Sequence, residues 1–314
     1  MQTQSGAIVS KLLTNVSNGY VPTGYIAEQV LPAIYVAQTT GKLGKYTNNH
    51  LRIVNTVHQG KGPYRQLESV TVSSDTYSIE DHGLFDIVTE NDIRNYEQPF
   101  DAERDTSMAL TTALALGKEY ALASTLQNAS VITNGTTLSG NAQYDNLDHA
   151  DSTPLQDKLD ADASIEAATG MQPNVAIMSP KVYRAMRFNA QLMKYLGFTE
   201  MRPNGLTTDE LARALDLERI LVGRAMYNAA KEGQSDDMQY VWGKDLIYAR
   251  IEQPGLMQKT LGFEVRKTGT QPRQVYRFNP TMPVNSRGVI VSDNYDQLIL
   301  NAAAAYLIQD AVSQ

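Results

Sequence analysis

The chain has 314 residues, which is long enough for one large domain or two ordinary ones with a sizeable core. Hydrophobic residues make up 42% of it and charged residues 19%, and these ordinary globular values exclude a chain that is disordered throughout. The formal net charge of -7 argues against a protein whose main work is to grip nucleic acid over a broad face.

No apolar run approaches the ~20 residues that a membrane span requires, so no membrane association is expected. The amino-terminal residues lack a basic start followed by a long apolar block, and we therefore expect no signal peptide. There are no cysteines, which excludes disulfides and thiolate metal sites and fits synthesis in a reducing cytoplasm.

The first part of the chain resembles an arm followed by a long hairpin. Residues 1–40 alternate short apolar pieces with glycine and proline, which favours an arm over a compact unit. Residues 41–70 are poor in large apolar groups, and Gly60-Lys61-Gly62-Pro63 marks a turn. Strands are predicted on both sides of this turn, around Ile53, Val57, Val70 and Val72. Because a lone hairpin is marginal in water, we expect this segment to lie on something else.

A long helix is predicted at residues 99–128, after a strand at 84–90 (LFDIVTE). Pro99 suits the first helical position. Three carboxylates would lie near the positive end of the helix dipole: Asp101, Glu103 and Asp105. About 29 residues at 1.5 Å each would make a rod of ~45 Å. The apolar positions keep no strict heptad, so we expect a scaffold that other elements lie across.

A compact α/β unit is predicted next, from the order helix, strand, helix, helix, strand. The first helix would begin at a capping box of Thr153 and Gln156 and end at Gly170. The next elements are a strand at Asn174–Met178, a helix from Pro180 to about Leu196, a helix opened by the capping box of Thr207 and Glu210, and a strand at 218–223.

The last part of the chain is predicted to be strands. These are GFEVRK (262–267), QVYRF (274–278), RGVIVSDN (287–294) and QLIL (297–300). No internal repeat of 20–50 residues is visible.

The charges are distributed unevenly. Residues 75–105 and 145–166 are acidic, whereas 259–287 carries six Lys or Arg residues against Glu264 alone. One interpretation is that these are solvated faces of opposite sign. The other is that acidic 75–105 and basic 259–287 meet between copies of the chain, where complementarity sets register and partner choice.

A search for catalytic or ligand-binding residues starts at Ser179, which stands where an apolar strand runs into a helix. A nucleophilic serine or a phosphate at such a corner needs glycine neighbours, and here the flanks are Met178 and Pro180. We therefore interpret Ser179 as a helix N-cap followed by proline at the first helical position.

The other candidates for chemistry fail on spacing. The four histidines, His50, His58, His82 and His149, form no metal-binding pattern. The run from Asp160 to Ser164 lacks the glycine of a calcium loop, because Ile165 stands there. Residues 41–45 lack the spacing of a phosphate loop. We therefore predict no enzyme activity, no cofactor and no metal.

The order of several stretches resembles the major capsid proteins of tailed bacteriophages, which have the Hong Kong 97-like fold. The stretches are IAEQVLPAIYVAQTTGKLGKY, DTYSIEDHGLFDIVTENDIRN, PFDAERDTSMALTTALALGKE, MQPNVAIMSPKVYRAM, LTTDELARALDLERILVGRAMYNAAKEGQ, VWGKDLIYARIEQPG, SDNYDQLIL and AYLIQDAV. They reach from about residue 26 to 313, and their order and spacing carry the resemblance.

The resemblance implies an α+β fold divided into named parts. These are an N-terminal arm (1–40), an extended loop (41–83), a peripheral domain (84–150) with a spine helix (99–128), an axial domain (151–258), returning peripheral strands (259–302) and a return to the axial domain (303–314). The extended loop would lie over a neighbouring subunit, so that assembly into pentamers and hexamers completes the core.

The resemblance also implies a function and partners. The chain would form the icosahedral shell around the double-stranded DNA genome of a tailed phage, without sequence-specific DNA binding. It would be made in the host cytoplasm and reside in the virion capsid. A separate scaffolding protein is expected, because the chain leaves no room for a cleaved scaffolding segment; a portal and possible decoration protein are further partners.

Eight residues are candidate contacts between subunits: Lys61, Tyr64, Arg65, Glu68, Asp101, Glu103, Arg273 and Arg277. Lys61 lies near the expected loop tip, but no partner is evident for the covalent cross-link that some family members form. Two other functions remain open at this point: an encapsulin-like compartment shell, which shares the fold but loads a protein cargo, and an α/β enzyme centred on residues 174–223.

Overall fold

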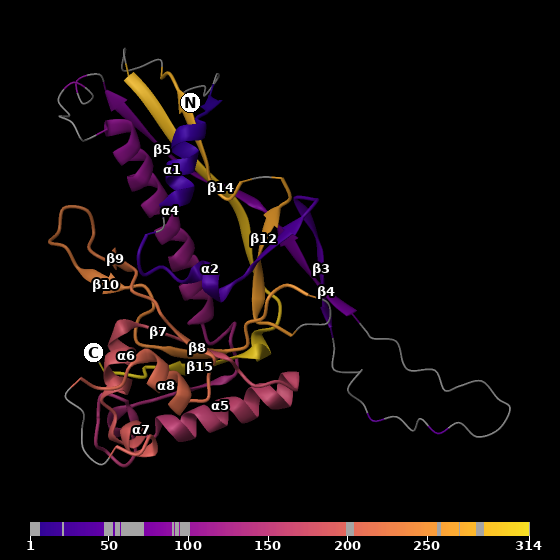
Figure 1. The fold of residues 1–314 in the computed structure, drawn as a ribbon, viewed down its shortest axis with the longest axis vertical. Coiled ribbons are helices and arrows are strands. Elements are labelled where there is room, and N and C mark those ends of the chain that lie inside the picture. Colours follow the sequence, from indigo (N-terminus) through magenta and orange to yellow (C-terminus); the bar gives the residue numbers. More distant parts are fainter. Residues whose placement is uncertain are drawn as a thin grey trace.

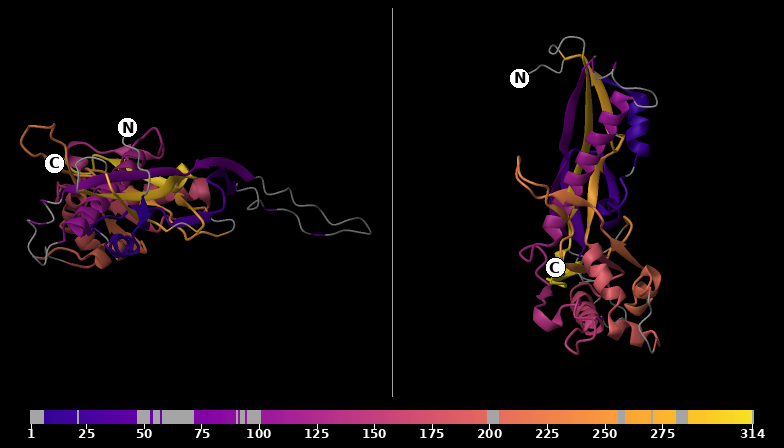
Figure 2. Two further views of the ribbon diagram at one scale, coloured as in Figure 1. Left: turned by 90° about the horizontal axis from the view of Figure 1, so that it is seen from above. Right: turned by 90° about the vertical axis from the view of Figure 1, so that its left-hand side faces the viewer.

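The computed structural model describes residues 7–20, 22–46, 53, 57, 72–89, 91, 94, 101–198, 204–255, 259–269, 271–280 and 286–313. An elongated sheet with one long helix is joined to a compact five-stranded sheet with short helices (Figure 1). The side view shows these two parts following one another along the long axis (Figure 2). The mixture of separate helices and mostly antiparallel strands confirms the predicted α+β class.

The elongated sheet is organised around β14 (Ser286–Ile299), a strand of 14 residues. The strands run in the order β1 (Ile8–Val9), β13 (Gln274–Phe278), β14, β12 (Gly262–Lys267) and β2 (Ala33–Val36), and β5 (Glu80–Thr89) also pairs with β14. The predictions for β12 and β13 are confirmed. The two strands predicted at 287–294 and 297–300 are wrong as separate elements. They form one strand because Tyr295 pairs with Glu80 on β5 and Asp296 pairs with Val265 on β12, which continues the ladder without a break.

The long helix α4 (Ala102–Leu126) packs against β5 and β14. It begins later than predicted, because Asp101 has extended backbone angles and caps the helix with its side chain. α1 (Lys11–Gly19) lies within the predicted arm, and the sequence analysis did not predict this helix. Ser10 caps α1, and the hydroxyls of Ser17 and Thr111 hydrogen bond at 2.8 Å, which fixes α1 against α4.

The five-stranded sheet has the order β6 (Gly135–Thr137), β15 (Ala305–Gln309), β11 (Leu246–Ala249), β7 (Val175–Met178) and β8 (Arg219–Val222). Its helices are α5 (Pro154–Thr169), α6 (Pro180–Arg187), α7 (Ala190–Tyr195) and α8 (Thr208–Ala214). Since β6 pairs with β15 and Tyr144 is buried in the same cluster as α5 and α6, residues 135–144 pack with this sheet. The predicted boundary at residue 150 therefore separates residues that pack together.

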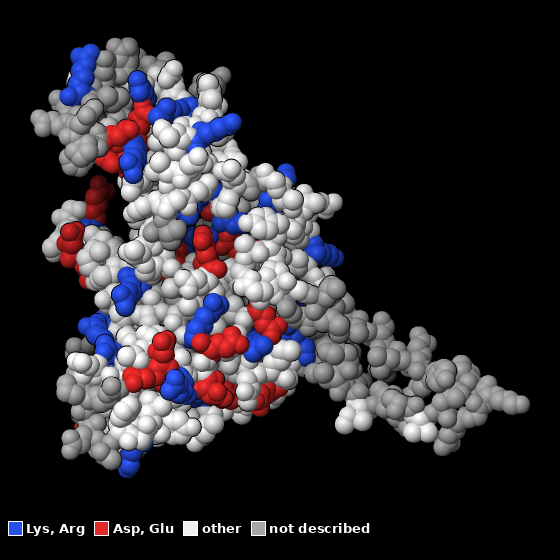
Figure 3. All heavy atoms as spheres, in the orientation of Figure 1, with Lys and Arg blue, Asp and Glu red and all other residues white. Residues whose placement is uncertain are grey.

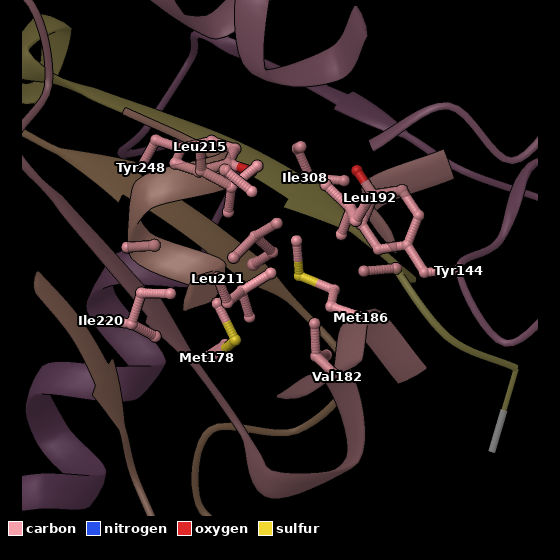
Figure 4. Packing of buried hydrophobic residues seen from close by; sticks show 14 of the residues in the cluster. Tyr144, Met178, Val182, Met186, Leu192, Leu211, Leu215, Ile220, Tyr248 and Ile308 are labelled. Carbon is pink, nitrogen blue, oxygen red and sulfur yellow. The ribbon is translucent and has the colours of Figure 1, made fainter. Parts of the chain in front are cut away.

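Both faces of the five-stranded sheet are buried, which explains the fully apolar β7. Met178 packs in a cluster with Met186, Leu192 and Leu211 on the helical side (Figure 4). Ile177 points to the opposite face and packs in a cluster that includes Leu126 of α4. Side chains alternate between the two faces of a strand, so β7 joins the helices on one side to the long helix on the other.

Two hairpins extend from this body. β3 (Thr40–Tyr46) pairs antiparallel with β4 (Val72–Ser78), and this pair leads away from the body in Figure 1. β9 (Met226–Asn228) pairs with β10 (Met238–Tyr240) and lies on the other side of α4. Two strands pair on either side of the predicted turn, with Val72 in β4, but Ile53 and Val57 are not in strands; Val70 and the turn at 60–63 lie outside the described residues. The pairing instead uses residues 40–46 and 72–78. The short helix α2 (Ala27–Val30) and β2 precede β3 in the chain.

Two helix predictions need correction and two are confirmed. The helix predicted from Pro180 to Leu196 is two helices, because Asn189 leaves the helical conformation and caps α7 through its side chain. Thr153 makes no side-chain capping bond, so the first capping box is wrong. Gly170 ends α5 in the left-handed conformation, and the Thr207–Glu210 capping box is present.

Candidate assembly surface

The predicted contacts of the loop tip, Lys61, Tyr64, Arg65 and Glu68, lie outside the described residues. Their contacts between subunits stay a prediction. The other four predicted contacts, at α4 and near β13, can be placed.

Asp101 and Glu103 are engaged within the chain. Asp101 accepts hydrogen bonds from the N–H groups of Glu103 and Arg104 at 3.1 and 3.4 Å. Glu103 is 4% exposed, and its carboxylate forms ion pairs with Arg277 and, at 2.5 Å, with Arg287. The acidic 75–105 segment and the basic 259–287 segment therefore meet here in one copy, and a further contact between them across copies stays a prediction.

Arg273 lies near the end of α1. Its guanidinium donates to the carbonyl oxygen of Tyr20 at 3.4 Å, and its own carbonyl accepts from the Asn18 side chain. The side chain is half-buried. A lateral contact through Arg273 stays a prediction.

Sequence reasoning missed a buried ionic network beneath α4. Lys118 forms ion pairs with Glu264 at 2.7 Å and Glu28 at 3.2 Å. Arg266 reaches Glu264 at 2.5 Å and holds Asp293 through two hydrogen bonds, at 2.6 and 3.2 Å. Lys118, Glu264, Arg266 and Asp293 are all 6% exposed or less. The network joins α2, α4, β12 and β14, and it adds to the apolar packing of α4 against β14.

The charges in the network shift one another's protonation. Burial would raise the pKa of Glu28, but the charge and hydrogen bond of Lys118, together with the charges of Arg273 and Arg266, lower it. Burial would likewise lower the pKa of Arg266, but its hydrogen bond to Asp293 and the charge of Glu264 raise it. The Lys118 ammonium lies 5.1 Å from the ring centroid of Tyr295, and the ring of His82 stacks on Tyr295 at 4.4 Å between centroids.

Glu119, the next residue of α4, holds a second junction. Its carboxylate is fully buried and accepts from the N–H groups of Ile26 and Ala27, at 3.0 and 2.7 Å, and from the Trp242 indole at 2.6 Å. Burial raises the pKa of Glu119, and these hydrogen bonds oppose the shift. After Asp105, Lys118 and Glu119 are the only charged residues in α4. This isolated charged pair in a helix rich in Ala and Leu was the signal in the sequence that could have indicated buried ionic contacts.

Large apolar side chains remain exposed on the elongated sheet and on α1 beside it. They include Ile8 at 74%, Leu12 at 70%, Tyr35 at 57% and Phe85 at 54%. Phe85 contacts Phe278 edge-to-face at 6.2 Å. A single copy therefore leaves apolar surface uncovered in the same part of the molecule that depends on buried ionic contacts.

Ser179 behaves as a cap. It is fully buried, and its hydroxyl accepts from the Val182 N–H at 3.4 Å. Within the described ranges, no group of three or more acidic, histidine or cysteine side chains is arranged to hold a metal ion. None of the helices in that part of the chain combines the length and hydropathy that a membrane span requires.

Two relatives match the sequence over most of its length. The chain is 25% identical over 322 residues to a major capsid protein of Burkholderia phage BcepMu, covering 96% of both chains. It is 27% identical over 234 residues to a major capsid protein of Pseudomonas phage JBD67, covering 74% of this chain and 73% of the other. No protein-family model matches the chain.

Solved structures share the fold over nearly the whole chain. A phage-related protein from Bordetella bronchiseptica RB50 superposes with a TM-score of 0.73 at 23% identity, covering 98% of this chain and 99% of that one. The capsid of cyanophage P-SCSP1u has a TM-score of 0.59 at 9% identity, covering 98% and 92%. The virus-like particle from Pyrococcus furiosus has a TM-score of 0.55 at 13% identity, covering 95% and 96%.

The architecture is that of a phage capsid protein with the Hong Kong 97-like fold. The chain is a homologue of phage major capsid proteins, which confirms the resemblance found in the sequence.

Proposed function

We propose that this chain is the major head protein of a tailed phage, which self-assembles into pentamers and hexamers to form an icosahedral shell around double-stranded DNA. The observation that carries the proposal is the match to a phage major capsid protein over 96% of both chains. The large apolar side chains exposed on β1, α1, β2 and β5 support assembly, because burying them against a neighbouring copy is favourable.

The proposed organisation follows the fold. The β3–β4 hairpin leads away from the body, as expected of a loop that lies over a neighbouring subunit. The division into arm, extended loop, spine helix, peripheral and axial domains is part of the proposal, with residues 135–144 assigned to the axial domain because they pack with its sheet. Lys61, Tyr64, Arg65, Glu68 and Arg273 remain proposed contacts between subunits.

The partners and the site of action belong to the same proposal. The shell would be built in the host cytoplasm on a separate scaffolding protein, with a portal and possible decoration protein, and would remain in the virion capsid. It would act without enzyme activity or a cofactor. A net charge of -7 suits a wall that encloses DNA, because tight binding to the wall would hinder packing.

Electron microscopy tests the proposal. The full chain is expressed alone and together with the scaffolding protein of its phage, and the particles are imaged and their cargo is analysed. We expect closed shells that package DNA during infection. Particles that hold a protein cargo instead would favour a compartment shell, and monomers under both conditions would refute the proposal.

A further inference from the structure

The helix α6 borders a groove of about 500 Å³ that the function described above does not use. Leu147, Ala185, Phe188 and Val312 line it, together with Lys181, Arg184 and Asp145. Asp145 accepts hydrogen bonds from both the N–H and the hydroxyl of Ser313, so its carboxylate is already engaged. The groove thus combines apolar lining with two cations at one edge.

The cations of the groove have few partners within the chain. Arg184 donates through Nε to the carbonyl of Pro180 at 3.1 Å, one turn back on its own helix, and its side chain is exposed. Lys181 forms no ion pair within 4 Å among the described residues. A carboxylate from outside the chain could therefore pair with either cation.

The exposed face of α5 has the complementary character. Leu159 is 59% exposed, and Ala163 and Ala167 are exposed on the same side of the helix at four-residue spacing. Asp160 and Glu166 are exposed and border this apolar stripe on its two sides. Acidic side chains lie along α5 in the lower part of Figure 3. The small alanines leave room for a close approach.

The two surfaces cannot satisfy each other in one copy. In Figure 1, α5 runs along the lower edge toward the right and α6 lies at the lower left. Two α5 faces would repel each other, as would two basic grooves, so charge disfavours a symmetric pair. A contact between α5 of one copy and α6 of the next is heterologous, and heterologous contacts that close make rings.

Resting on the proposed function, we infer that the α5 face of one subunit docks in the α6 groove of the next subunit around each pentamer and hexamer. Leu159 enters the apolar groove, and Asp160 and Glu166 pair with Lys181 and Arg184. The occupant is a second copy of this chain, because its own α5 supplies both the apolar stripe and the charges that the groove lacks.

A cysteine pair tests this contact directly, since the chain has no cysteine of its own. The full-length double variant Leu159→Cys/Ala185→Cys is oxidised mildly and separated without reductant. We expect a covalent ladder that ends at five or six subunits. Each single variant, and the pair Glu232→Cys/Ala185→Cys on an unrelated exposed loop, should give no ladder above a dimer. Absence of the ladder from a double variant that still forms shells would overturn the inference while leaving the proposed function intact.

A charge exchange provides a second test. Lys181→Glu/Arg184→Glu and Asp160→Lys/Glu166→Lys should each reduce the assembled fraction at least tenfold in sedimentation, and the quadruple variant should recover it. Far-UV circular dichroism checks that each variant is folded. Normal assembly by both double variants would refute the pairing. Loss of assembly without recovery in the quadruple variant, and without the cysteine ladder, would assign the groove to a different acidic partner and also overturn the inference.

Discussion

The elongated sheet and the five-stranded α/β unit differ in how their side chains are buried. The α/β unit buries an apolar core on both faces of its sheet, and β7 is completely inaccessible. The elongated sheet is held to α4 by buried ion pairs and by a small apolar cluster, and it leaves several large apolar side chains exposed. An apolar core is complete in one copy, whereas exposed apolar edges need another surface. In one copy α4 already covers the second face of the α/β unit's sheet, and we expect neighbouring copies to cover the exposed side chains of the elongated sheet.

Two buried lysines make the sharpest comparison between the regions. Lys118 is 5% exposed beneath the elongated sheet, and Lys158 is 4% exposed in the α/β unit. Lys118→Met should lower the free energy of unfolding by about 3–5 kcal/mol, because buried Glu264 loses a counter-ion. Lys158→Met should cost only about 1–2 kcal/mol, because its partner Asp162 keeps 19% exposure and can regain water. Urea denaturation followed by circular dichroism measures both.

The exposed Lys194→Met serves as the control for the lysine pair and should stay within about 0.5 kcal/mol of the parent. Equal costs for Lys118→Met and Lys158→Met would show that the ionic network does not distinguish the two regions.

Two leucines compare core with edge. Leu192→Ala should destabilise the α/β unit by about 2–5 kcal/mol, because Leu192 is fully buried among Met186 and its neighbours. Leu12→Ser should change the stability of the isolated chain by no more than about 0.5 kcal/mol, since Leu12 is 70% exposed on α1. The same Leu12 variant should reduce the yield of shells, measured by sedimentation. A normal shell yield would mean that Leu12 faces solvent in the shell too.

Ser179 gives a smaller effect confined to the α/β unit. Ser179→Ala should cost about 1 kcal/mol, because it removes the cap bond to the Val182 N–H. Thermal unfolding measures the loss, and Ser179→Thr should restore most of it. Shell assembly by the alanine variant should be normal. An assembly defect in a variant that is otherwise stable would show that Ser179 does more than cap α6.

The folded corner at Ser179 also shows what local sequence could predict. A strand, a Ser cap and a proline are local features, and the structure has them as expected. The network around Lys118 was not predictable in this way, because its members come from residues 28, 118, 264, 266 and 293, which only the tertiary fold brings together.

The charge pattern left two interpretations open for a related reason. Acidic 75–105 and basic 259–287 are complementary, but composition does not say whether they meet within one copy or between two. The β5–β14 pairing places them in one sheet, and Glu103 then reaches Arg277 and Arg287 of the same chain. The break at Asn189 was missed because apolar spacing continued across it while the cap ended the helix.

Acidification should affect Glu28 on α2 and the two carboxyls Asp157 and Asp162 of α5 in opposite directions, and this is the smallest of the predicted effects. The pKa of Glu28 is lowered in the folded state, so its contribution is present above its ordinary pKa of 4.5 and is lost as the pH falls. Burial raises the pKa values of Asp157 and Asp162 in the α/β unit, so their contributions are present below the ordinary pKa of 3.8 and are lost as the pH rises. Glu119 shares this second sign.

Hydrogen exchange between pH 6 and pH 4, corrected for the intrinsic exchange rates, measures this difference. Protection around α2 and β12 should fall relative to that of β7 and α5. Glu28→Gln should remove most of the pH dependence at α2, and its persistence in that variant would assign the effect to another group.

The most direct measurement compares hydrogen exchange of the unassembled chain with that of the assembled shell. We expect assembly to increase protection strongly in the elongated sheet, at β1, α1, β5 and the β3–β4 hairpin, and to leave the already protected β7 and β11 unchanged. Equal protection of the elongated sheet before and after assembly would contradict the conclusion that neighbouring copies complete it.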